Sequence, residues 1–300
     1  MKKVFVPQSE DKGKRLDIYL SEKLDLSRSQ IKKLIEKDKV LCNGQVLKKS
    51  GEEIKESWAI EVFLEEELPI KAFPQNIPLD IVYEDEDFAV VNKPRGMVTH
   101  ICQASPKDTL VNAAMYHIKN LSDINGELRY GIVHRLDKST SGLILIAKNN
   151  DSHISLANQI ANRTAMRYYL GVVEGNLKDD EGEIEEPIAR HAVDRKKMAV
   201  REGGRYAKTY YRVLERFMDY TLVEFRLHTG RTHQIRVHMK HIQHPIVGDA
   251  KYGTKKRFAH GQLLHAHKLI IKHPGTQEEM LFTALLPDYF EKFLNKLRNG

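Results

Sequence analysis

The segment EEELPIKAFPQNIPLD (65–80) most restricts how this 300-residue chain can fold. It is acidic at its start and carries three prolines, which have no amide hydrogen and interrupt regular hydrogen-bonded structure. This composition is typical of an extended linker. We therefore expect two folded units, residues 1–64 and residues 81–300, joined by a linker at 65–80.

The first unit is predicted to contain two helices and a few short strands. Apolar residues recur at helical spacing over 16–24, and Ser27 is placed to cap a second helix. The outer side of that helix would carry cations four residues apart, which makes them neighbours on its surface. These cations are Arg28 with Lys32, and Lys33 with Lys37. Asn43-Gly44 predicts a tight turn, with short strands at 40–42 and 60–63.

In the second unit, runs of strands outnumber helices. Segments 81–83 and 88–92 flank an acidic turn and predict a hairpin. Further strands are expected at 143–147, 168–173 and 220–227, and helices at 109–119 and 151–161. This order predicts an α+β domain built on a mixed, largely antiparallel sheet.

The positive charge of the chain is concentrated in one region. The formal net charge is +7, and residues 1–70 hold equal numbers of cations and carboxylates. Residues 195–273, by contrast, hold 18 Lys and Arg against five Asp and Glu. Tyrosines and phenylalanines interleave with these cations, which favours a nucleic-acid partner over a merely solubilising surface.

Several classes of protein are not expected. No apolar run approaches the length of a membrane span, and the N-terminus lacks the apolar core of a secretory signal. Cys42 and Cys102 show no CxxC spacing, so we expect a reducing, cytoplasmic location without disulfides. No phosphate-binding glycine loop or GxSxG elbow occurs, so no nucleotide cofactor is expected. A monomer is the default expectation.

One carboxylate stands in an unusual setting. In GIVHRLDKSTSGLILIA (131–147), Asp137 lies between Arg135 and Lys138 and is followed by a turn of small residues. Nearby positive charge favours the ionised form, which can act as a nucleophile or as a general base. The alternative to a chemical role is that Asp137 forms an ordinary surface salt bridge with its neighbours. A glycosidase would need a second carboxylate, and Asp123 and Glu127 are not comparably constrained.

A second motif, TGRTHQIRVHMKHIQHPIVGDAKYG (229–253), is rich in histidine and arginine. Thr232 is expected to cap a helix with Ile235 and Met239 on one face, although a strand remains open from periodicity alone. Arg231 would then lie at the helix entrance, free to reach a carboxylate elsewhere. Nine of the 14 histidines fall in 228–273, but HExxH spacing is absent and no metal site is expected.

Taken together, these motifs resemble those of the RluA-type pseudouridine synthases, which modify ribosomal and transfer RNA. The resemblance covers nearly all of residues 80–290. Its stretches are DFAVVNKPRGMVTH, HRLDKSTSGLILIAKN, RYYLGVVEG, GEIEEPIAR, LHTGRTHQIRVHM, HPIVGDAKYG and LLHAHKLIIKHP. Residues 15–44 are similar to the small RNA-binding module first named from ribosomal protein S4. The combination of this module with a synthase domain favours large-subunit ribosomal RNA as the substrate.

The resemblance implies a reaction without cofactor or metal, in which the glycosidic bond of uridine breaks and carbon-5 is joined to the ribose. Asp137 matches the catalytic carboxylate, whose role as nucleophile or base stays open. Tyr169 matches the tyrosine that stacks on the base. Arg231 matches the arginine paired with the carboxylate. Arg135 matches the residue that enters the RNA stack when the base flips out. Further RNA contacts are expected at Arg167, Lys93, Arg28, Lys32 and Lys33.

Three alternatives remain at this stage: a transfer-RNA pseudouridine synthase, an RNA-binding protein without activity, and an N-glycosidase that releases free base. Three departures from the family pattern are visible, one of which is Ser57-Trp58 in place of the usual Gly-Asp of the N-terminal module. Arg167 stands where many members have lysine, and Asp38 occupies a usual glycine position. Asp38 would tolerate the positive φ of such a turn better than most residues.

Overall fold

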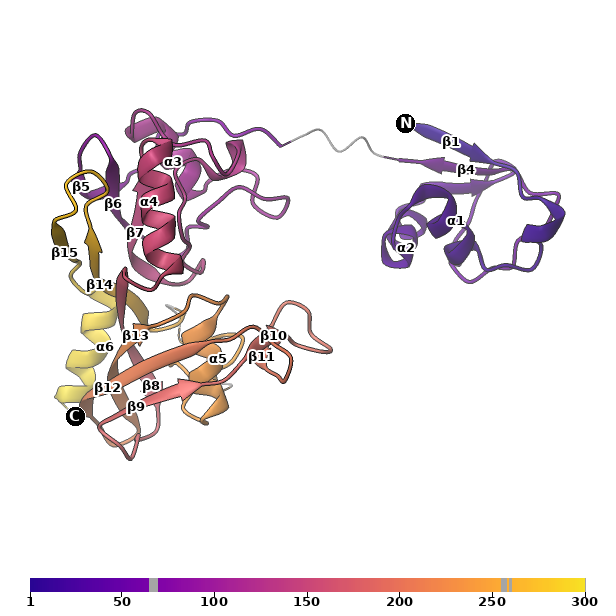
Figure 1. Ribbon diagram of the computed structural model, residues 1–300. Helices are drawn as coiled ribbons and strands as arrows, with labels where there is room; N and C mark the ends of the chain where they lie inside the picture. The colour runs from indigo at the N-terminus through magenta and orange to yellow at the C-terminus, as the bar shows by residue number, and fades with distance from the viewer. Residues whose placement is uncertain (65–69, 255–257, 259–260, 300) are drawn as a thin grey trace. The chain divides into compact units, whose positions relative to one another are not determined.

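The computed structural model describes residues 1–64, 70–254, 258 and 261–299. Contacts divide the chain into two compact units, Met1–Pro69 and Ile70–Gly300 (Figure 1). The expected linker begins in 65–69, which lie outside the described residues. Its later part packs on the second unit, because Ile70 and Leu79 contact the core and the Asn112 side chain donates to the carbonyl of Phe73 (2.8 Å).

The N-terminal unit pairs two helices with a four-stranded sheet of order β1-β4-β2-β3. Ser27 precedes the second helix as expected, and its amide donates to the Gln30 side chain (2.9 Å). Asn43 and Gly44 both have positive φ, as a type I′ hairpin turn requires, and Asp38 has a φ of +59°. The elements are β1 (Lys2–Phe5), α1 (Leu16–Leu24), α2 (Arg28–Glu36), β2 (Val40–Cys42), β3 (Gln45–Val46) and β4 (Ile60–Phe63), with a 3-10 turn at Ser9–Asp11.

The second unit is built on a nine-stranded sheet of order β5-β6-β7-β14-β8-β13-β12-β9, with β15 beside β14. Among the described strand pairs of this sheet, only β7–β14 is parallel, which confirms the predicted α+β class. The strands are β5 (Asp80–Glu84), β6 (Phe88–Lys93), β7 (Ser141–Ala147), β8 (Met166–Glu174), β9 (Glu181–Glu185), β12 (Lys208–Arg216), β13 (Tyr220–Leu227), β14 (Leu264–Lys272) and β15 (Glu279–Thr283), with a separate hairpin of β10 (Ile188–Arg190) and β11 (Met198–Val200).

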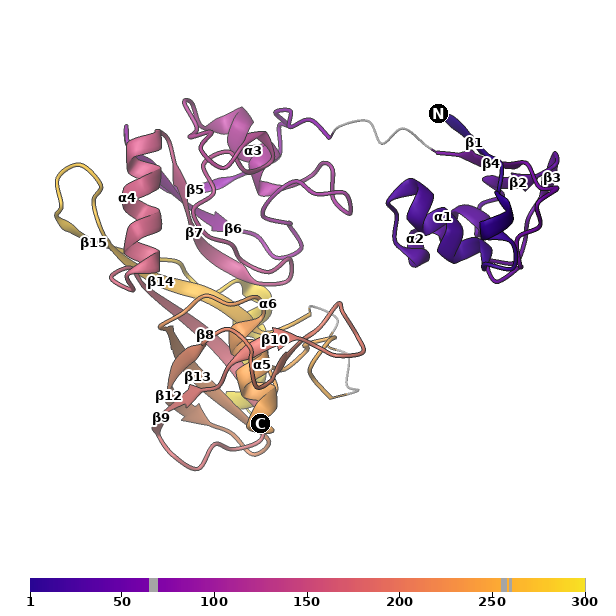
Figure 2. The same ribbon diagram turned by 45° about the vertical axis from the view of Figure 1, so that its right-hand side comes forward.

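Helices cover both faces of this sheet, so alternate strand residues enter different cores. In β6, Phe88 and Val90 contact the core that includes Leu156 of α4, whereas Ala89 and Val91 face the opposite core. Figures 1 and 2 show α4 and α6 along the sheet. The helices are α3 (Leu110–His117), α4 (Asn150–Ala161), α5 (Gln234–His241) and α6 (Asp288–Arg298), with a 3-10 turn at Glu127–Arg129.

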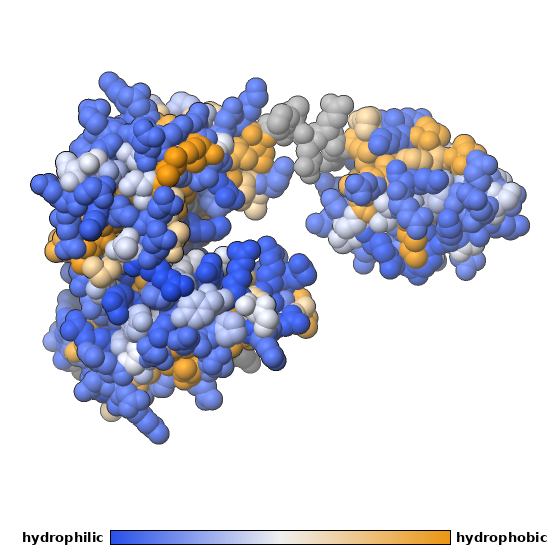
Figure 3. All heavy atoms as spheres, in the orientation of Figure 1, coloured by the Kyte–Doolittle hydropathy of each residue, from blue (hydrophilic) through white to orange (hydrophobic). Residues whose placement is uncertain are grey.

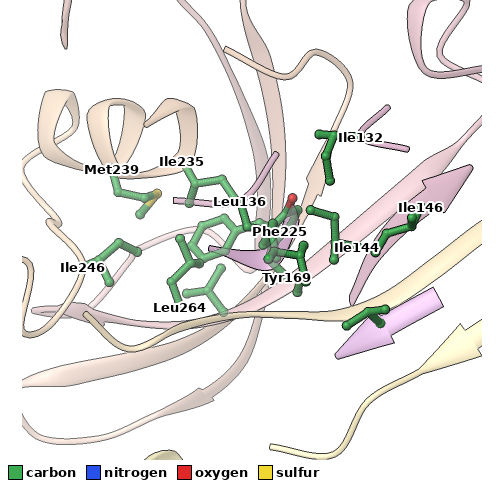
Figure 4. Close-up of a cluster of buried hydrophobic side chains, with 14 of the residues drawn as sticks. Ile132, Leu136, Ile144, Ile146, Tyr169, Phe225, Ile235, Met239, Ile246 and Leu264 are labelled. Carbon is green, nitrogen blue, oxygen red and sulfur yellow. The ribbon is translucent and has the colours of Figure 1, made fainter. Parts of the chain in front are cut away.

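The core beneath α5 positions the candidate site. Ile235 and Met239 of α5 point toward Phe225, and Leu136 and Tyr169 lie in the same cluster (Figure 4). The outer surface in the view of Figure 3 is mostly hydrophilic. Among the described residues, no helix combines the length and the apolar character that crossing a membrane requires.

Candidate active site

The loop that carries Asp137 is held on both sides by backbone hydrogen bonds. The amide of Thr140 donates to the carbonyl of Asp137 (3.1 Å), and the amide of Gly96 donates to the carbonyl of Lys138 (2.7 Å). The Thr99 hydroxyl donates to the carbonyl of Leu136 (2.8 Å). These bonds keep the carboxylate in one place at the start of β7.

A glycine near the start of β7 allows two strands to meet. Gly142 has a φ of +113°, and a Cβ there would overlap the backbone of Ala266 in β14. The parallel pairing of β7 and β14 therefore depends on a residue without a side chain. The small residues noted after Asp137 serve this strand contact.

The carboxylate of Asp137 is paired with Arg236, not with the predicted Arg231. Arg236 Nη1 lies 2.7 Å from Asp137 Oδ2. The same guanidinium binds Asp249 through two bonds, Nε to Oδ2 at 2.6 Å and Nη2 to Oδ1 at 2.8 Å. Both partners of this second pair are buried. Arg236 thus bridges a pocket carboxylate and a structural one.

Charge on this bridge is stabilised from both sides. Burial opposes the charge of Arg236, but the hydrogen bonds that it donates to Asp249 and the nearby Asp137 carboxylate raise its pKa above the ordinary value. Burial likewise favours protonation of Asp249, yet Arg236 and the amides of Lys251 and Tyr252 hold its pKa below the usual range. Guanidinium is protonated at any physiological pH, so Asp137 keeps a permanent cationic partner.

The predicted pairing of Arg231 with the carboxylate is therefore wrong in this structure. Arg231 precedes α5, and its Nε donates to the carbonyl of Tyr206 (2.9 Å) at the pocket rim. α5 begins at Gln234, and its N-cap residue is His233, which lies one residue after the cap expected at Thr232. Of Arg231 and Arg236, only Arg236, which lies within the helix, is buried. Position 236 lies three residues before the buried Met239, and that helical spacing is the signal that favours Arg236.

Tyr169 reaches the same pocket from β8. Its side chain is buried, and the pocket lining includes Asp137, Tyr169 and Arg135. Burial raises the pKa of the Tyr169 hydroxyl, and the nearby Arg167 acts in the opposite direction. A neutral, buried aromatic ring beside a carboxylate offers a flat surface for a base. The structure therefore brings together the predicted Asp137, Tyr169 and Arg135.

A groove rich in cations adjoins the pocket. Its lining residues include no Asp or Glu among those described, and Arg135 and Arg231 belong to both the groove and the pocket. The β10–β11 hairpin forms one side. We call this surface the basic groove, defined by Arg135, Arg190, Arg195, Lys196, Arg205 and Arg231.

Two predicted RNA contacts are buried instead. Lys93 has no exposed surface, and its Nζ donates to the carbonyls of Pro94 and Met97 (2.9 Å each). Burial lowers the pKa of Lys93 to about 7, although the nearby Asp137 raises it. The predicted RNA contact at Lys93 is corrected to a structural role, because the loop that Lys93 holds includes Gly96, which binds beside Asp137.

Arg167 is also buried, with 6% of its surface exposed. Its Nη1 lies directly beneath Gly230, where an added Cβ would approach it to 2.8 Å. Its Nε has no hydrogen-bond partner among the described residues. In this structure Arg167 supports the floor of the site rather than the RNA-facing surface that was predicted.

The cations predicted on the N-terminal unit lie on the exposed side of α2. Arg28 binds Asp17 (2.7 Å), and Lys32 lies 3.9 Å from Glu36, whereas Lys33 is exposed. Asp17 also binds Arg15, and these bonds lower the pKa of Asp17 to about 2 against the effect of burial. A role of Arg28, Lys32 and Lys33 in RNA binding stays a prediction.

The clustered histidines have ordinary protein partners. Both ring nitrogens of His238 are bonded, to Thr209 and to the carbonyl of Glu186 (3.0 Å each). His244 bonds the carbonyl of Glu174 (2.8 Å). In the part of the chain that the structure describes, no group of three or more His, Cys, Asp or Glu is arranged to hold a metal.

Residues that the sequence reasoning missed complete the site. Arg236, Asp249 and Tyr252 lie in the stretches HQIRVH and VGDAKYG, and His233 was considered only as a metal ligand. The Tyr252 hydroxyl bonds His233 (2.7 Å). All four residues belong to the histidine-rich motif at 229–253, but their mutual contacts depend on how α5 packs against the loop that follows it.

Comparisons with known proteins identify the family to which this chain belongs. The model of the RNA pseudouridylate synthase family matches residues 87–241, and that of the S4 domain matches residues 14–57. An uncharacterized RNA pseudouridine synthase, YlyB, of Bacillus subtilis is 44% identical, with both chains covered completely. Ribosomal large subunit pseudouridine synthase D of Haemophilus influenzae is 40% identical, covering 97% of this chain and 93% of that protein.

Solved structures show the same catalytic fold. The human protein RNA Pseudouridylate Synthase Domain Containing 4 has a TM-score of 0.58 at 26% identity, covering 73% of this chain and 93% of that one. Human RNA Pseudouridylate Synthase Domain Containing 1 has a TM-score of 0.57 at 25% identity, covering 74% of this chain and 96% of that one.

Proposed function

We propose that this chain, which belongs to the RNA pseudouridylate synthase family, isomerises specific uridines of large-subunit ribosomal RNA. The enzyme is an isomerase that acts on RNA. The observation that carries the assignment of its site is the Asp137–Arg236 ion pair (2.7 Å) in a pocket that also contains Tyr169.

Pseudouridine formation leaves the atoms of the nucleotide unchanged. The bond from C1′ to N1 breaks, a bond from C1′ to C5 forms, the hydrogen on C5 leaves as a proton, and N1 takes up a proton. A carboxylate serves either route, attack on the sugar or removal of a ribose proton. Arg236 pairs with the Asp137 carboxylate, and Tyr169 would offer its ring to the base.

The target base must leave the helical stack to reach this pocket. Arg135 is exposed and lines both the pocket and the basic groove, so its side chain is placed to fill the space that the flipped base leaves. The other five cations of the groove would hold the neighbouring phosphates. The proposal assigns Asp137 and Tyr169 to the chemistry, and Arg135 and the groove to the RNA.

The choice of ribosomal RNA rests on similarity and on the N-terminal unit. Relatives about 40% identical over nearly the whole chain carry the name ribosomal large subunit pseudouridine synthase D. The S4-like unit, with Arg28, Lys32 and Lys33 on one exposed helix, would add contacts to folded RNA. Transfer RNA is the second candidate substrate. The proposal includes a monomer acting in the cytoplasm, which size-exclusion chromatography and cell fractionation would test.

The test measures tritium release from RNA that carries [5-³H]uridine. Wild type, Asp137→Asn and the surface control Asp151→Asn would each be assayed on unmodified large-subunit ribosomal RNA and on transfer RNA. We expect release from ribosomal RNA by wild type and by Asp151→Asn, and none by Asp137→Asn with RNA affinity nearly intact. Release only from transfer RNA would replace the proposed substrate.

Two other outcomes would reject the proposed site or reaction. Full activity of Asp137→Asn would remove Asp137 from the chemistry. Free uracil in the products, detected by chromatography, would indicate an N-glycosidase, because an isomerase retains the base on the RNA.

A further inference from the structure

His233 lies where no role has been assigned, between the pocket and the basic groove. It stands at the entry of α5 in the left-handed conformation, with a φ of +58°, and its side chain is 12% exposed. This backbone conformation is uncommon for residues other than glycine, although asparagine, aspartate and histidine adopt it more often than the rest. It turns the imidazole toward Asp137, with Nε2 3.9 Å from Oδ2.

The contacts of Tyr252 favour one tautomer of His233. The amide of Met198 donates to the Tyr252 hydroxyl (2.8 Å), and His233 Nδ1 lies 2.7 Å from the same oxygen. Because this oxygen already accepts from Met198, a hydroxyl proton that points at His233 lets the hydroxyl act as acceptor in one bond and as donor in the other. Nδ1 is then the acceptor, and the neutral ring carries its proton on Nε2.

The surroundings of His233 keep the ring neutral. Burial lowers the pKa of His233 to about 4. Asp137 and Asp249 act to raise this pKa, whereas Arg236 on α5 and Lys251 in the loop that follows act to lower it. At neutral pH the group that faces Asp137 is therefore an N–H dipole and not a second full cation.

The two carboxylate oxygens of Asp137 differ in their neighbours. Arg236 Nη1 and His233 Nε2 both approach Oδ2, at 2.7 and 3.9 Å. Among the described residues, none donates a hydrogen bond to Oδ1. We propose that His233 is a positioning residue for Asp137. In the RNA-bound enzyme His233 presents its Nε2–H to Oδ2 of Asp137, so that Oδ1 faces the ribose. Tyr252 sets the tautomer of His233.

A neutral donor suits this position for a physical reason. A second cation at Oδ2 would stabilise the carboxylate further and make Oδ1 a weaker nucleophile or base, whereas an N–H dipole orients it at less cost. Met198 belongs to β11, so the hairpin that lines the basic groove also fixes this proton. The inference deepens the proposed function and rests on it.

The test uses substitutions that separate the two ring nitrogens. His233→Gln can place an amide nitrogen near the position of Nε2, whereas His233→Asn can reach only the position of Nδ1. We expect His233→Asn and His233→Leu to lower kcat about tenfold or more with RNA affinity unchanged, and His233→Gln to stay within about threefold of wild type. His241→Leu, an exposed site on the same helix, is the control.

A second readout does not depend on activity. Nitrogen-15 NMR of histidine-labelled protein reports the tautomer of each ring, and we expect Nε2–H for His233 in wild type at pH 7. Tyr252→Phe removes the hydroxyl that directs this proton, so the variant should show a mixture of tautomers and a reduced kcat. Normal kcat in His233→Leu, equal losses in His233→Gln and His233→Leu, or an Nδ1–H signal in wild type would each overturn the inference.

The two proposals fail in different ways. Absence of tritium release by wild type from any RNA would contradict the proposed function. Release by wild type together with full activity of His233→Leu would reject the role of His233 alone. The NMR measurement addresses the tautomer even where a variant folds poorly, because it is made first on the wild-type protein.

Discussion

Arg236 and Asp137 are 99 positions apart in the sequence, and their side chains meet at 2.7 Å. Arg236 extends from α5, whereas Asp137 lies on the loop before β7, so the contact exists only when α5 has packed on the sheet. The remaining guanidinium nitrogens bind Asp249. One buried cation thus joins the folded core to the proposed reacting group.

Substitution of Arg236 should impair both stability and activity. Arg236→Leu would leave the buried Asp249 without its cation, and breaking a buried pair in this way costs about 3–5 kcal/mol. We expect no detectable tritium release and a lower urea midpoint. Arg231→Leu is the matched control, for which we expect normal stability, a kcat within about threefold of wild type and weaker RNA binding. The reverse pattern would restore Arg231 as the partner.

Lys93 should give stability a distinctive pH dependence. Its folded pKa, about 7, lies below the unfolded value of 10.5, so the unfolded chain binds more protons between these values. The free energy of unfolding should therefore gain a rising contribution from pH 7 to about 10.5. Below pH 7 the full penalty of burying a charge applies.

The measurement for Lys93 is urea denaturation at several pH values for wild type and Lys93→Met. Tyrosines and other lysines titrate in the same window, so the difference between the two proteins is the relevant quantity. We expect the free energy of unfolding of wild type to rise relative to that of Lys93→Met as the pH increases. A difference independent of pH would show that Lys93 is not depressed in the folded state.

Gly142→Ala should disrupt the junction of β7 and β14. A methyl group would overlap the backbone of Ala266, and the φ of +113° is unfavourable for alanine. We expect a loss of about 3 kcal/mol or more, measured by thermal unfolding. Gly126 has a φ of +77° with open space around it, so Gly126→Ala should cost less, about 1–3 kcal/mol from backbone strain alone. Equal losses would mean that the close approach is unimportant.

The basic groove should determine the salt dependence of RNA binding. Neutralising Arg195 and Lys196 together removes two exposed cations that line it. We expect weaker binding, a slope of log affinity against log salt reduced by roughly 0.7 for each phosphate that is no longer neutralised, and an unchanged kcat at saturating RNA. Arg212→Gln removes a cation that is already paired with Glu224 outside the groove, and it should change none of these.

Local features of the fold were predictable because they depend on neighbouring residues. Asn43-Gly44 adopts the positive φ values of a type I′ turn, and Ser27 precedes α2, since both follow from backbone chemistry within a few positions. The hairpin of β5 and β6 was likewise visible from short apolar runs around an acidic turn. The family motifs identified Asp137 and Tyr169, and both residues line the pocket.

Burial and pairing of charged side chains were not predictable in the same way. Lys93 and Arg167 were expected at the RNA surface, but both are buried, because the folding of distant segments over them decides their exposure. The wrong prediction of Arg231 as the partner of Asp137 has the same origin. Arg231 and Arg236 belong to one motif, and only Arg236 is buried in the fold.

The sequence by itself determined the two-unit organisation, the α+β class and the family, and it singled out Asp137 as the proposed reacting carboxylate, because these depend on local patterns and on motifs that persist in order along the chain. The tertiary structure alone decided which cation holds Asp137, where the basic groove opens and how Tyr252 directs the proton of His233. Such relationships join residues far apart in the chain, and their geometry arises only when helix, loop and sheet pack together.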